Sequence, residues 1–107
     1  MKLDANFAYL NHMYMDEYYP RFLVDKVKDQ IVEVVRFLES GPHSKEEIQD
    51  KLDKMTMGIN DLQEEFEEHE SELETVARDS IAETVEQILA AFHIDIDIET
   101  ALQERDW

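Results

Sequence analysis

Residues 61 to 74 concentrate acidic side chains, because the stretch DLQEEFEEHESELE places eight carboxylates in fourteen positions. Such a run can bind a cation, imitate nucleic-acid phosphates, or solvate the outer face of a helix. Helical geometry separates these options, since successive residues are rotated by about 100°. Six apolar residues that recur from Ile48 to Phe66 at steps of three and four fall within about 40° of one direction, and the carboxylates of this helix up to Glu68 lie about 100° or more away. The acidic run is therefore predicted to face outward.

The histidines and serines form no recognisable catalytic or transition-metal pattern. A di-iron bundle needs Glu-x-x-His pairs that project inward, whereas Phe66 stands three residues before His69. The four histidines are scattered singly, and the serines sit mainly where helix caps are needed. No nucleophile and base can be paired, and no Gly-rich phosphate loop occurs. We assign no catalytic residue, cofactor or metal, and an enzyme remains the third functional alternative.

The segment DIDIET is the other candidate for a cation site. Asp95, Asp97 and Glu99 alternate like the first ligands of a calcium loop, and Asp106 falls at its twelfth position. Thr100 occupies the sixth position, where that loop requires Gly, and the twelfth is usually Glu. Cation binding by these three acids stays open at this stage. The favoured role of Asp95 or Asp97 is to cap a final short helix.

Two groups of residues are candidates for contacts with a partner protein. Aromatic residues are dense between residues 7 and 22, and tyrosine is enriched at docking surfaces, so Tyr18 and Tyr19 are the first candidates for anchors. The second group is the exposed acidic face, which comprises Glu64, Glu65, Glu67, Glu68, Glu70 and Glu72.

The spacing of Glu74 and Arg78 predicts a partly buried structural ion pair on the fourth helix.

The elements that must position these groups are predicted to be helices. The chain has only two Gly and two Pro among many good helix formers, which favours an all-α fold. Apolar spacing predicts a small helical bundle with four principal helices and a short C-terminal one, in a single domain over residues 1–107. The predicted ranges are 4–14, 20–39, 44–69, 72–93 and about 98–105.

Local signals refine these boundaries. Ser44 with Glu47 and Ser71 with Glu74 have the spacing of capping boxes, which open the third and fourth helices. Gly58 weakens the third helix but permits a close approach by a neighbouring helix. The stretch IDIDIE alternates like a strand, but it is isolated, so we interpret it as an extended connector that packs its isoleucines against the bundle.

The charge distribution constrains the partners. The formal net charge is −17, and residues 55 to 107 hold two Lys or Arg against sixteen acids, a net charge of −14. Binding to nucleic acids or anionic membranes requires clustered Lys and Arg, so we expect neither, and any protein partner is expected to be basic. The chain has no cysteine and shows no signal peptide or membrane-spanning stretch. These features predict a cytoplasmic protein.

Four stretches together resemble a known family. YMDEYYPRFLVDK, INDLQEEF, ETVARDSIAE and the terminal Trp107 are similar to a family of small acidic bacterial proteins designated as a domain of unknown function. The resemblance spans nearly the whole chain and implies a bacterial, cytoplasmic protein. It implies no catalytic or binding residue.

Three functions follow from these observations. The first is a non-enzymatic protein–protein interaction module that docks through its aromatic N-terminal edge or its acidic face. The second is an inhibitor of a basic protein, either an immunity-type protein or a nucleic-acid mimic, in which carboxylates replace phosphates. The third is an unrecognised enzyme. The oligomeric state is open.

Overall fold

The computed structural model describes residues 2–107, and its regular elements are five α-helices. α1 spans Asn11–Met15, α2 spans Arg21–Glu39, α3 spans Lys45–Glu68, α4 spans Thr75–Ala91, and α5 spans Ile98–Ala101. The described residues contain no β-strand. The predicted all-α class is therefore confirmed.

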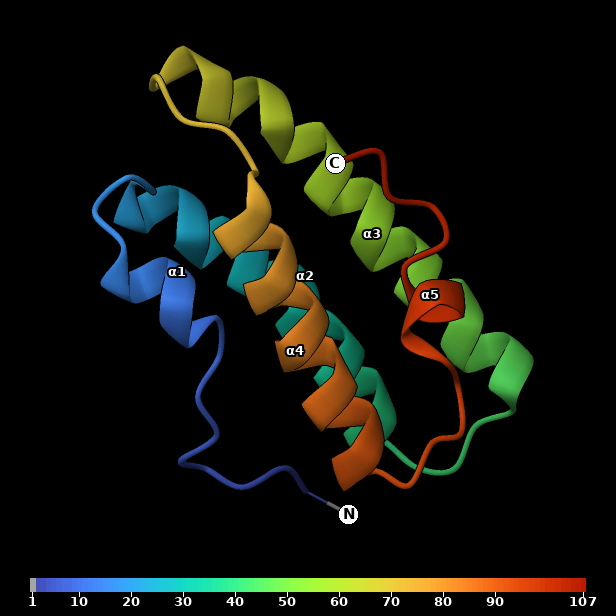
Figure 1. Ribbon diagram of the computed structural model, residues 1–107. Coiled ribbons are helices and arrows are strands. Elements are labelled where there is room, and N and C mark those ends of the chain that lie inside the picture. The colour runs from blue at the N-terminus through green and yellow to red at the C-terminus, as the bar shows by residue number, and fades with distance from the viewer. Residues whose placement is uncertain (1) are drawn as a thin grey trace.

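The three long helices share one hydrophobic core. α2 and α3 are antiparallel neighbours joined by a short loop, and α4 runs back in the direction opposite to α3 (Figure 1). α1 lies beside α4, whereas α5 and the tail that follows it lie along α3. The predicted seam of α3 is confirmed, because all six of its residues are buried: Ile48, Leu52, Met55, Ile59, Leu62 and Phe66.

The start of α3 follows directly from the sequence. The Ser44 hydroxyl accepts a hydrogen bond from the Glu47 N–H at 3.1 Å, and the Glu47 carboxylate accepts one from the Ser44 N–H at 2.9 Å. This is the predicted capping box, and hydrogen bonds to the Glu47 carboxylate from the backbone N–H and the side chain of Ser44 hold the pKa of Glu47 below its ordinary value. α2 is also close to its prediction, with Pro20 immediately before its first helical residue.

The first predicted helix, 4–14, is wrong over most of its length. Asp4 accepts a hydrogen bond from the N–H of Asn6, which makes a local turn in place of a helical start. Leu10 adopts the left-handed conformation, and its N–H donates to the Thr84 hydroxyl at 3.1 Å. α1 therefore begins only at Asn11, and the preceding segment packs apolar side chains on the core without helical backbone.

The fourth helix begins at Thr75 and not at residue 72, so the second predicted capping box is wrong. The Ser71 hydroxyl donates to the carbonyl of Tyr18 at 3.0 Å, which turns it away from the start of α4. Glu74 is the N-cap residue and makes no side-chain cap bond. The short last helix is also shorter than predicted and ends at Ala101.

α5 and the tail after it are held against the outer side of α3 by polar side chains. Gln49 donates to the Thr100 carbonyl at 2.9 Å, and Asn60 donates to the Glu104 carbonyl at 2.8 Å. Asn60 also accepts from the N–H of Asp106. Beneath these bonds, Leu102 is fully buried in the core.

Gly58 allows the close approach that its position in the sequence predicted. A Cβ atom added there would lie 2.7 Å from Cδ of Gln30, so the Gln30 side chain of α2 lies over the glycine. This contact lies beside the seam of α3 and helps α2 pack against it.

Candidate functional site

The two predicted anchor tyrosines lie in different environments. Tyr18 is 42% exposed, whereas Tyr19 is only 5% exposed and packs edge-on against Phe66. The Tyr19 hydroxyl accepts a hydrogen bond from the N–H of Ala77, and burial raises the pKa of that phenol. Tyr19 is therefore a core residue, and the prediction that it is a surface anchor is wrong. Phe22 lies one turn along the chain and is 47% exposed.

The structure brings the aromatic segment and the acidic run to the same end of the molecule. The Ser71 hydroxyl bonds the carbonyl of Tyr18, and the rings of Phe22 and His69 meet edge-on with centroids 5.0 Å apart. Lys26 of α2 pairs with Glu65 of α3 at 2.6 Å. These three contacts thus fix the end of α3 and the loop after it beside the start of α2.

The acidic residues around this region are exposed. Glu64, Glu67, Glu68, Glu70 and Glu72 are solvent-exposed, and none of them forms an ion pair within residues 2–107. Glu65 is half buried and is the member of the predicted group that has an internal cationic partner. We call the surface made by Tyr18, Phe22 and the five unpaired glutamates the aromatic–acidic end.

A tight turn positions the loop between α3 and α4. The N–H of Ser71 donates to the Phe66 carbonyl at 2.9 Å, and the N–H of Glu70 donates to the Glu67 carbonyl at 3.1 Å. Glu70 has a φ of 57°, so the pair of bonds forms a Schellman motif with a glutamate at the position that glycine favours. The motif ends α3 and directs the chain toward Tyr18.

Glu74 and Arg78 do not form the expected partly buried pair in the described chain. Both side chains are exposed, and the contact between these residues is the helical bond from the Arg78 N–H to the Glu74 carbonyl. The ion-pair expectation therefore has no counterpart in the structure.

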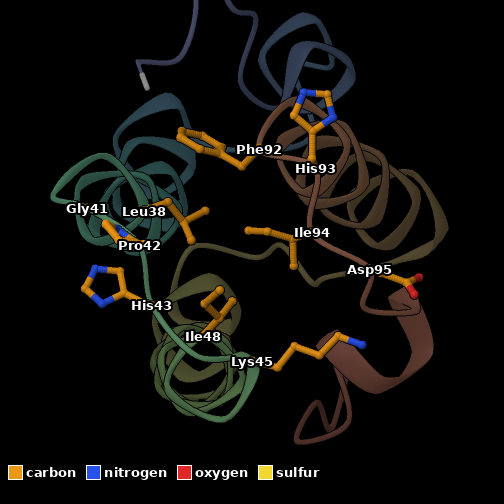
Figure 2. Close-up of a pocket in the computed structure, with 10 residues that line it drawn as sticks. All are labelled: Leu38, Gly41, Pro42, His43, Lys45, Ile48, Phe92, His93, Ile94 and Asp95. Carbon is orange, nitrogen blue, oxygen red and sulfur yellow. The ribbon is translucent and has the colours of Figure 1, made fainter.

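A cavity of about 390 Å³ lies at the other end of the bundle, where the α2–α3 loop meets the end of α4. In Figure 2, Leu38 and Ile94 point toward each other across it, whereas the rings of His43 and His93 point away. His43 is held by the Phe37 carbonyl at 2.9 Å and stacks on the Phe37 ring. The two imidazoles therefore do not converge on the cavity as an acid–base pair would.

The acidic side chains are also candidates for a metal site. Among residues 2–107, no three His, Cys, Asp or Glu side chains are grouped closely enough to hold a metal ion. Asp97 accepts a hydrogen bond from the Glu99 N–H and caps α5, which confirms the capping role predicted for Asp95 or Asp97. No described helix is long and apolar enough to cross a membrane.

A protein-family model for a family of unknown function, DUF5713, matches residues 3–107. The chain belongs to this family. The match confirms the resemblance to a domain of unknown function that the sequence motifs indicated. No curated protein matches the chain. No solved structure matches it either.

Sequence reasoning missed the exposed position of Phe22. Its signal is the position of Phe22 on the helical wheel of α2, where it lies roughly 160° from the centre of the buried apolar face. An aromatic residue on the polar side of an amphipathic helix is a candidate surface anchor. No comparable signal distinguishes Tyr18 from Tyr19, because both lie in the non-helical segment between α1 and α2.

Proposed function

We propose that the protein is a non-enzymatic interaction module that docks a basic protein through its aromatic–acidic end. The observation that carries this proposal is that the Ser71–Tyr18 bond and the Phe22–His69 contact place two exposed rings beside the exposed acidic end of α3 and the loop after it. Aromatic side chains supply the buried centre of many interfaces, and surrounding charges select the partner and speed encounter. Tyr18 and Phe22 take the anchoring role, and the glutamates form the rim.

An inhibitor of a basic protein, of the immunity or nucleic-acid-mimic type, is the second candidate. It is favoured by the acidic array itself, since the unpaired glutamates lie on one exposed end of α3 and the loop that follows. In this case the carboxylates carry the binding and the rings contribute little. A cytoplasmic location and a bacterial source, both expected from the sequence, belong to either proposal.

Site-specific photo-crosslinking tests the docking surface directly. A photoreactive phenylalanine analogue replaces Tyr18 in one variant and Glu86 in a control, since Glu86 is exposed on α4. The proposal predicts that the Tyr18 variant captures a discrete basic protein in its source cell and that the Glu86 variant does not. Equal capture by both variants, or capture of acidic proteins, would contradict it.

A further inference from the structure

The connection between α4 and α5 alternates half-buried and exposed side chains as a β-strand does. No strand pairs with it in the described chain. Residues 94 to 98 alternate Ile and Asp, and the isoleucines are half buried against the core whereas Asp95 and Asp97 are exposed. The backbone of Asp97 is extended, with φ −63° and ψ 142°. A side-chain period of two with one buried face is the signature of a strand.

The backbone of this connection has free hydrogen-bonding groups along its middle. Within residues 2–107, the N–H groups of Asp95, Ile96 and Asp97 donate no hydrogen bond, and the carbonyls of Asp95 and Ile96 accept none. The bonded groups begin on either side, at Ile94 in the turn after α4 and at Glu99 in the cap of α5. Free backbone groups on an extended segment are a template for an added strand.

Two adjoining cavities follow this connection where it passes the start of α3. The larger has a volume of about 390 Å³, and the second has about 360 Å³. Lys45 and Asp95 line both cavities, so the two are neighbours along the connection, and we call them together the 94–97 groove. The apolar walls of the larger cavity are Leu38, Ile48, Phe92 and Ile94 (Figure 2).

We propose that the 94–97 groove binds an extended peptide segment of a partner protein by strand addition, and that this segment alternates basic and aliphatic residues. The free N–H and carbonyl groups of the connection supply the main-chain hydrogen bonds. An aliphatic side chain of the peptide enters the apolar cavity beside Ile94. Basic side chains at alternate positions face Asp95 and Asp97, which lie on one exposed side of the segment.

Charge excludes a second copy of the chain as the added strand. In an antiparallel pair centred on Ile96, Asp95 of one copy would stand directly opposite Asp97 of the other, and like charges directly opposite destabilise a ladder. The formal charge of −17 on each copy adds further repulsion. A basic segment places positive charges opposite Asp95 and Asp97, so neither kind of repulsion arises.

This groove is separate from the aromatic–acidic end. It lies at the N-terminal end of α3, whereas the aromatic–acidic end lies at the C-terminal end, and the 24 residues between them span about 36 Å. The proposal therefore stands whether or not Tyr18 and Phe22 bind a partner.

Two synthetic peptides of identical composition provide the test, the alternating KVKVKVK and the grouped KKKKVVV, both with blocked ends. Titration into isotopically labelled protein near 0.15 M salt, roughly physiological ionic strength, limits non-specific attraction. We expect the alternating peptide to bind at least about tenfold more tightly, and the largest amide shift changes at residues 95–97. Equal affinities, or the largest changes at Glu64–Glu72, would overturn the proposal.

Two double variants with the same net charge distinguish specific docking from general electrostatic attraction. Asp95→Asn with Asp97→Asn removes two charges and retains a side chain that can cap α5, and Asp61→Asn with Asp79→Asn makes the same change at exposed positions elsewhere. We expect the first variant to lose at least about fivefold in affinity and the control to change by less than about twofold. Equal losses would overturn the proposal, as would a peptide-free dimer that protects the amides of residues 95–97.

Discussion

Glu70 carries backbone strain that its side chain does not relieve. Its φ of 57° lies in the left-handed region, which disfavours side chains other than Gly, Asn and Asp. We predict that Glu70→Gly raises the free energy of unfolding by up to about 1 kcal/mol, because glycine is favoured at this position of a Schellman motif. Urea denaturation measures the change. Glu72→Gly is the control and should be neutral or destabilising, since Glu72 has no positive φ.

The capping box at the start of α3 gives a pH dependence with a definite sign. Because the folded-state pKa of Glu47 is lowered by its bonds to Ser44, its contribution to stability is present above the unfolded-state pKa. That contribution is lost as pH falls through the lowered folded-state value. We predict that Glu47→Gln is less stable than the wild type at neutral pH and that the difference shrinks below about pH 4.3, the ordinary pKa of Glu. A difference that stays constant down to pH 2 would contradict this assignment.

Two serines show which local hydrogen bonds could be predicted from the sequence and which could not. The cap at Ser44 was predictable, because the residues that form it are three positions apart. The role of Ser71 was not, because its hydroxyl bonds Tyr18, a residue 53 positions away. A distant carbonyl can compete for the serine hydroxyl that a local capping box would use, and tertiary contacts then determine which hydrogen bond forms.

At the scale of elements, the long helices and the connector before α5 were predictable, whereas the irregular segment before α1 was not. The seam of α3 has six residues at alternating steps of four and three, so the period determines which residues are buried. The spacing of Leu3, Phe7 and Leu10 predicts only that these side chains lie on one side of their segment. An irregular segment held by the hydrogen bond from the Leu10 N–H to the Thr84 hydroxyl meets the same condition. The alternation of IDIDIE correctly indicated an extended connector with its isoleucines inward.

The α3 seam predicts a large cost for truncation at its buried positions. Leu62 is buried, so Leu62→Ala should lower the free energy of unfolding by about 2 to 5 kcal/mol through lost burial and the cavity left behind. Met57 lies on the same helix but is 44% exposed, so Met57→Ala should change it by less than about 0.5 kcal/mol. Chemical denaturation compares the two variants. Similar losses for both would show that the seam is misassigned.

At the scale of the whole molecule, charge repulsion should limit stability. A formal charge of −17 on 107 residues places many exposed carboxylates near one another, and salt screens their repulsion. We predict that raising sodium chloride from about 0.02 to about 0.3 M near neutral pH raises Tm by about 4 to 8 °C, which corresponds to about 1 kcal/mol. A fall in Tm over this range would show that attractive ion pairs outweigh repulsion. Whether all 107 residues unfold as a single domain stays a prediction for the same experiment.

The most direct measurement of the proposed function is binding to the isolated partner across a salt series. The two variants are Tyr18→Ala with Phe22→Ala, and the Gln replacement of the five unpaired glutamates at the aromatic–acidic end. An interaction module predicts that the aromatic variant loses affinity by at least about tenfold at every salt concentration, whereas the glutamine variant mainly slows association at low salt. Unchanged affinity in the aromatic variant would contradict docking through Tyr18 and Phe22.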